Sequence, residues 1–129
     1  MKFFLVLLLT RDGELQEQAA TAAASSGARL TVAQNVGEAL QIVCERGREL
    51  DLVVIDFDNG TRGMALLSAL SVWRADLPIV ALTSADRDHS DELVYADGAA
   101  CCLTKPINAA DFEMVIWRLA KTTLQTELA

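Results

Sequence analysis

The segment Leu52-Val53-Val54-Ile55-Asp56-Phe57 decides the fold. It is apolar except for Asp56, and a short continuous apolar run of this kind is typical of a central strand covered on both faces of a sheet. A carboxylate at the end of such a strand is costly to leave without a partner. The segment therefore predicts a buried strand that brings one acidic group to the edge of a parallel sheet.

The rest of the chain alternates strands with helices. Further strands are predicted over Phe3–Leu9, around Leu30 and Val32, over Ile79–Thr83 and over Ala100–Thr104. Helices are predicted over Glu14–Ser25, from an Asn35 cap to Gly47, over Met64–Arg74, over Asp86–Ala96, and from an Asn108 cap to about Glu127. Five strands joined by crossover helices predict a doubly wound α/β domain with a five-stranded parallel sheet and five helices.

The composition is that of a folded domain with an acidic surplus. Of the 129 residues, 52% are hydrophobic, and Asp and Glu outnumber Lys and Arg by 18 to 11, for a formal charge of −7. We expect no direct contact with nucleic acid, which calls for a basic surface. No stretch approaches the roughly 20 apolar residues of a membrane span. Five of the acids fall in the predicted helix over Asp86–Ala96 and its exit, so the surplus is interpreted as a property of the surface.

Cysteine usage and the amino terminus indicate a cytoplasmic protein. The odd count of three cysteines, without a C-x-x-C spacing, favours buried thiols in a reducing compartment: Cys44, Cys101 and Cys102. The apolar start resembles a signal peptide, which is the alternative interpretation. A buried strand is favoured, because Arg11 and Asp12 follow before any small-residue cleavage site.

The polar residues at the predicted strand ends are the candidates for function. In a doubly wound sheet the site lies beyond the carboxyl ends of the strands. That rule selects Thr10, Arg11, Asp12, Asp56, Thr83 and Lys105. A lysine across the edge can pair with Asp56, and a hydroxyl and an ammonium beside a carboxylate suit the oxygens of a phosphoryl group. The alternative, for any one of them, is a strand-end polar group that faces water.

Three segments carry a family resemblance: Asp51–Asp56, Leu82-Thr83-Ser84, and Gly98–Pro106 with its Leu-Thr-Lys-Pro ending. They resemble the receiver domains of bacterial response regulators, over essentially the whole chain. The resemblance implies one flavodoxin-like receiver domain over residues 1–129, with strand order 2-1-3-4-5. It also implies a signal-transduction protein of a two-component phosphorelay, not an enzyme. Its partners would be a histidine kinase or phosphotransfer protein and a downstream output protein.

The resemblance also implies roles for individual residues. Asp56 matches the phosphoacceptor, Thr83 the switch hydroxyl, and Lys105 the ammonium that pairs with the phosphate. The Lys105–Pro106 bond matches one that is cis in the family, a form nearly confined to X-Pro bonds. Asp58 matches the position whose backbone carbonyl helps to hold magnesium.

The chain departs from the family after its first strand, where receivers carry two adjacent acids that bind the metal with the phosphoacceptor. Counting back from Leu15, these positions hold Thr10 and Arg11. A shift of one residue would restore Asp12 as a ligand, giving a metal set of Asp12, Asp56 and Asp58. Without the shift, magnesium lacks the carboxylates it prefers. Arg11 is then predicted to pair with Asp56 in place of the cation and to block metal-assisted phosphoryl transfer.

Two functions remain open. One is a competent, magnesium-dependent receiver that a histidine kinase phosphorylates on Asp56. The other, which the Thr10-Arg11 pair favours, is a pseudo-receiver that works by protein contact without phosphorylation. No further domain follows Leu128, so the chain is either a stand-alone receiver or a fragment of a longer regulator.

The last predicted helix carries a second apolar stripe: Met114, Trp117, Leu124 and Leu128. This stripe is either the edge of a wide apolar face or a contact surface for a partner. A homodimer through the fourth and fifth helices is one form that the contact would take.

Overall fold

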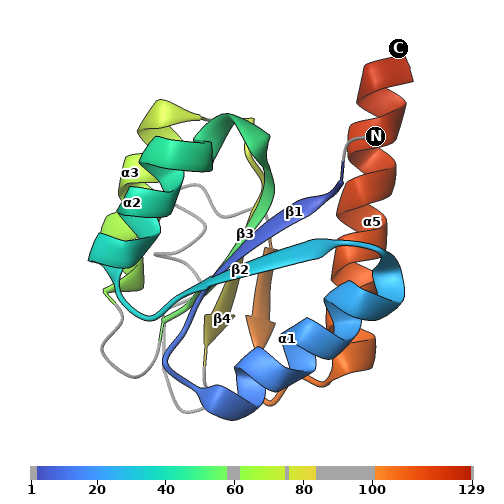
Figure 1. The fold of residues 1–129 in the computed structure, drawn as a ribbon, viewed down its shortest axis with the longest axis horizontal. Helices are drawn as coiled ribbons and strands as arrows, with labels where there is room; N and C mark the ends of the chain where they lie inside the picture. The colour runs from blue at the N-terminus through green and yellow to red at the C-terminus, as the bar shows by residue number, and fades with distance from the viewer. Residues whose placement is uncertain (1–2, 58–61, 75, 84–100, 129) are drawn as a thin grey trace.

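A five-stranded parallel sheet in the order β2-β1-β3-β4-β5 forms the centre of the molecule (Figure 1). The computed structural model describes residues 3–57, 62–74, 76–83 and 101–128, apart from the side chains of residue 101 and residues 120–128. The strands are β1 (Leu5–Leu9), β2 (Arg29–Ala33), β3 (Leu50–Asp56), β4 (Ile79–Thr83) and β5 (Cys101–Thr104). The helices are α1 (Gly13–Ser26), α2 (Val36–Arg46), the short 3-10 turn η1 (Gly47–Glu49), α3 (Gly63–Trp73) and α5 (Ala109–Leu128).

This arrangement confirms the predicted fold class and strand order. The predicted strand over Ile79–Thr83 is reproduced without change, and the other strands agree to within a few residues. The predicted acidic helix over Asp86–Ala96 lies outside the described residues.

Helices cover both faces of the sheet and divide the core in two. Figure 1 shows α2 and α3 on one face and α1 and α5 on the other. Alternate residues of the central strands supply the two layers: Leu7, Val53 and Ile55 point toward α2 and α3, while Leu8 and Val54 point toward α1 and α5. Burial on both faces explains why β1 and β3 are apolar without interruption.

Side-chain caps fix the starts of three helices. The Asn35 side chain accepts a hydrogen bond from the Glu38 backbone N–H at 2.9 Å. At α5 the exchange is reciprocal: Asn108 Oδ1 accepts from the Asp111 N–H at 2.9 Å, and Asp111 Oδ2 accepts from the Asn108 N–H at 3.2 Å. These are the two starts that the sequence pattern predicts. Asp12 caps α1 in the same way.

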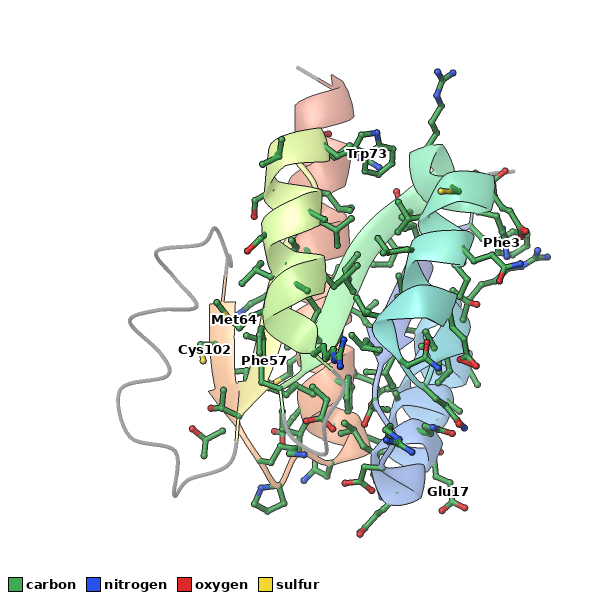
Figure 2. The ribbon with its side chains drawn as sticks, turned by 90° about the vertical axis from the view of Figure 1, so that its left-hand side faces the viewer. Phe3, Glu17, Phe57, Met64, Trp73 and Cys102 are labelled. Atoms are coloured by element: carbon green, nitrogen blue, oxygen red, sulfur yellow. The ribbon has the colours of Figure 1, made fainter. Side chains whose placement is uncertain are left out.

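The start of α3 approaches β3 so closely that it requires a glycine. A Cβ placed on Gly63 would lie 2.5 Å from Ile55 Cγ2 and 3.0 Å from the Phe57 ring. Figure 2 shows Phe57 and Met64 at this end of α3, with Trp73 at the other. The contact therefore fixes the first turn of α3 against the carboxyl end of β3.

We expect Gly63→Ala to destabilise the fold by about 1–3 kcal/mol, because the added methyl overpacks the fully buried Ile55. The measurement is the free energy of unfolding in urea. Gly13→Ala is the matched control, since a Cβ there meets nothing within 4 Å. A Gly63→Ala variant as stable as the Gly13→Ala control would contradict the close approach.

Candidate functional site

Three buried polar side chains lie at the carboxyl edge of the sheet. Leu9 of β1 pairs with Ile55 of β3, so the next residue on each strand, Thr10 and Asp56, lie side by side. Thr83 ends the neighbouring strand β4. Thr10 and Asp56 are completely buried, and Thr83 is 2% exposed. The edge rule therefore identified residues that the fold brings together.

Lys105 reaches this edge from the end of β5. Its backbone N–H donates to the Thr83 carbonyl at 2.8 Å, which continues the pairing of β4 with β5 by one residue. The following peptide bond, Lys105–Pro106, is cis, as the resemblance implies.

Two donors among the described residues contact the Asp56 carboxylate. Lys105 Nζ lies 3.0 Å from Oδ1, and Thr10 Oγ1 donates to Oδ2 at 2.6 Å. The Lys105 side chain is 15% exposed, so the ion pair is largely shielded from water. A buried carboxylate without partners would be strongly unfavourable. Both of its oxygens are therefore compensated by groups of the chain itself.

Thr10 connects Asp56 to the turn that leads into α1. While its hydroxyl donates to Asp56, the same oxygen accepts the Asp12 backbone N–H at 3.0 Å. From the sequence, Thr10 is expected at this edge of the sheet and in the place of an acid. Its role as a hydrogen-bond partner of Asp56 was missed, and a hydroxyl level with a buried strand-end carboxylate is the signal that would have revealed it.

The predicted ion pair between Arg11 and Asp56 is wrong. The structure describes both residues, and Arg11 is exposed and makes no ion pair with Asp56. The physical reason is that Thr10 turns its side chain toward Asp56, and successive residues leaving a strand point to opposite sides. Lys105 already supplies the compensating charge.

Asp12 is engaged in capping α1. Its Oδ1 accepts from the backbone N–H groups of Glu14 at 3.0 Å and Leu15 at 3.3 Å. This position agrees with the register that places Thr10 and Arg11 where the family carries its acids. Asp58, the third predicted ligand, lies outside the described residues.

The described residues at this edge do not fit a magnesium ion. Magnesium prefers carboxylate and water oxygens in an octahedral set. Within the described part of the chain, no group of three or more Asp, Glu, His or Cys side chains is placed to hold a metal. The two Asp56 oxygens face a lysine and a threonine instead.

Helix α5 exposes apolar side chains away from this edge. Met114 is 58% exposed and Trp117 is 68% exposed, one turn apart on the helix. Leu124 and Leu128 also lie on α5, but their side chains are outside the described part. The prediction of buried thiols is wrong for Cys44, which is exposed on α2, while Cys102 is partly buried and the side chain of Cys101 lies outside the described part. Among the helices that the structure describes, none combines the length and the hydropathy that a bilayer span requires.

Comparisons with known structures agree with this architecture. NtrX from Brucella abortus superposes with a TM-score of 0.84 at 22% identity, covering 98% of this chain and 29% of NtrX. A response regulator receiver domain protein from Clostridium thermocellum gives 0.84 at 19% identity, covering 96% of this chain and 99% of that one. The receiver domain of a Francisella response regulator gives 0.79 at 25% identity, covering 92% and 98%. This chain thus spans less than a third of NtrX.

The family comparison identifies the chain more directly. It matches none of the curated proteins with which it was compared. The family model described as the response regulator receiver domain, however, matches residues 6–116. This range is most of the sequence and contains all five strands except Leu5, the first residue of β1. The chain therefore belongs to the response regulator receiver domain family.

Proposed function

We propose that this receiver domain acts by protein–protein contact without phosphorylation of Asp56. The observation that carries the proposal is the occupied carboxylate: Lys105 Nζ lies 3.0 Å from Oδ1, and the Thr10 hydroxyl donates to Oδ2 at 2.6 Å. Receiver domains are in general signalling domains without enzymatic activity of their own, which agrees with such a role.

This arrangement opposes the chemistry of phosphoryl transfer. One oxygen of the carboxylate must attack phosphorus, while a metal ion neutralises the charge on the transferred group. The short bond from Thr10 stabilises the carboxylate as it stands and occupies the oxygen that Lys105 leaves open. Thr10 is neutral and Arg11 positive, so the turn after β1 offers no acidic group for the metal except Asp12, which caps α1.

The partner surface that we propose is the exposed side of α5. Trp and Met are enriched in the cores of protein interfaces, and Met114 and Trp117 are both more than half exposed. Leu124 continues this stripe in the sequence. The partners that we propose for this surface are a histidine kinase, a phosphotransfer protein, an output protein or a second copy of the chain.

A competent receiver is the second candidate, and one observation favours it. Thr83 ends β4, the neighbour of β3, and Lys105 follows β5, one strand further, with its ammonium already in contact with the Asp56 carboxylate. In that case magnesium would need Asp12, Asp56 and Asp58, and Asp12 would have to leave its cap on α1.

A phosphodonor assay distinguishes the two candidates. We expect acetyl phosphate or beryllofluoride with magnesium to leave the intact mass and the amide chemical shifts of the protein unchanged, because both Asp56 oxygens already accept hydrogen bonds and Thr10 and Arg11 stand where acids would hold the metal. A competent receiver treated in parallel shows that the reagents are active. An adduct in stoichiometric amount, lost in an Asp56→Asn variant, would establish the competent receiver instead.

Magnesium binding should return when both replaced acids are supplied. We expect the double variant Thr10→Asp, Arg11→Asp to gain about 2.7 kcal/mol of unfolding free energy at a magnesium concentration of about one hundred times its Kd. The wild-type protein should show no gain at that concentration. The measurement is urea unfolding with and without magnesium, with calcium-free buffers.

The single Arg11→Asp variant is the control for the role of Thr10. It should remain insensitive to magnesium, because the Thr10 hydroxyl still occupies Asp56. If Arg11→Asp alone binds magnesium as well as the double variant does, Thr10 is not the obstacle that we propose.

A further inference from the structure

A pocket lies between the end of α1 and the side of α5, which pack together on one face of the sheet (Figure 1). Its volume is about 310 Å³, at the lower end of the range of small-molecule sites. Phe4, at its rim, directly precedes β1, whereas Asp56 is the last residue of β3, so the pocket and Asp56 lie at opposite edges of the parallel sheet. The lining residues are Phe4, Ser25, Ser26, Glu113, Ile116 and Trp117.

The polar part of this lining carries a negative charge. Glu113, which is half-buried, supplies a carboxylate, and Ser25 and Ser26 supply hydroxyl groups. No Lys, Arg or His belongs to the described lining. Within the part of the chain that the structure describes, no hydrogen bond or ion pair engages the Glu113 carboxylate, whereas the Asp111 carboxylate on the same helix accepts the Asn108 N–H at 3.2 Å. The pocket therefore holds a carboxylate that the described chain does not compensate.

The end of α1 adds to this negative potential. Ser25 and Ser26 are the last two residues of the helix, and its last turn contains no basic residue. The carbonyl groups at the end of a helix carry a partial negative charge that favours cations. The backbone and the Glu113 side chain thus favour a ligand of the same sign.

Two aromatic side chains complete the pocket. Trp117 follows Glu113 by four residues on α5, so the two side chains are neighbours on the helix surface, and Phe4 lines the same pocket. The faces of aromatic rings attract cations, tryptophan most strongly. The residue next to Phe4 already makes such a contact, because the Arg29 guanidinium lies 4.0 Å from the centre of the Phe3 ring.

We infer that this pocket binds an alkylammonium group, which belongs either to a small free amine or to a lysine side chain of a partner protein. Glu113 would pair with the ammonium, the Trp117 ring would cover the charge, and Phe4 and Ile116 would contact the alkyl stem. The inference goes beyond the proposed function, because it assigns a ligand to a pocket that shares only Trp117 with the proposed contact surface.

The test is a titration of the ¹⁵N-labelled protein with butylammonium chloride, which replaces sodium chloride at constant ionic strength. Saturable shifts are expected for the Trp117 indole N–H and for the amides of residues 25, 26 and 113. Butanol, the neutral analogue of similar shape, should bind at least about threefold more weakly, because it forms no ion pair with Glu113. The absence of saturable shifts, or equal binding of butanol, would overturn the inference.

Variants assign the binding to individual groups. Glu113→Gln and Trp117→Leu should each weaken butylammonium binding at least about threefold, whereas Trp117→Phe, which keeps a ring, should retain the affinity to within about twofold. Glu45→Gln is the matched control, an equal change of charge at an exposed position of α2 on the other face of the sheet, and should change the affinity less than about 1.5-fold (Figure 1). Equal weakening by Glu113→Gln and Glu45→Gln would contradict a local site.

Two lysines of the chain could compete for the pocket. Lys2 is close to Phe4 in sequence, and Lys121 follows Trp117 by four residues. Residue 2 and the side chain of residue 121 lie outside the described part of the chain. The double variant Lys2→Gln, Lys121→Gln should therefore bind butylammonium about as well as the wild-type protein. Saturation seen only in the double variant would show that the chain fills the pocket itself, and would overturn the inference.

The source of the ammonium group is resolved by a short lysine peptide and its Nε-acetylated form. Tighter binding of the lysine peptide than of butylammonium identifies a partner protein as the ligand, whereas equal or weaker binding identifies a free amine. Equal binding of the acetylated peptide would contradict recognition of the charge. None of these measurements involves magnesium, a phosphodonor or Asp56, so this inference and the proposed function fail separately.

Discussion

A carboxylate with no exposure to water is the constraint on which the functional edge of this protein depends. Asp56 ends an apolar strand at the middle of the sheet, and burial there is tolerable only with compensation on both oxygens. Lys105, 49 residues away in sequence, and Thr10, 46 residues away, supply it. The ends of β1, β3 and β5 are thereby joined through one side chain, and that network is part of the folded structure as well as the candidate site.

Internal compensation changes what this edge can bind. A receiver that uses magnesium needs an excess of negative charge to attract the ion. Here the Asp56 charge is matched by Lys105, and Asp12 is held by the first turn of α1. The described residues at this edge thus offer a cation a carboxylate whose charge is already balanced by the chain itself.

Local patterns were sufficient to predict most of this fold. Apolar runs locate the strands, and the reciprocal bonds between Asn108 and Asp111 are encoded within four consecutive residues. The edge rule placed Asp56 and Lys105 together because it needs only the order of strands. The position of Arg11 was mispredicted, since the direction of a side chain depends on how the chain turns after β1. The approach of Gly63 to Ile55 and the left-handed backbone of Arg62 arise from packing between distant segments, which no local pattern contains.

The most direct test of the central claim is the unfolding free energy of a Thr10→Val variant, which keeps the shape of the side chain and removes its hydroxyl. The account predicts a loss of about 1–3 kcal/mol, because a buried carboxylate oxygen loses its donor, with no recovery when magnesium is added. Thr21→Val, which removes an exposed hydroxyl on α1 that bonds to the Glu17 carbonyl, is the matched control and should change stability by less than about 0.5 kcal/mol. A Thr10→Val variant as stable as that control would show that Thr10 does not hold Asp56, and would contradict the account.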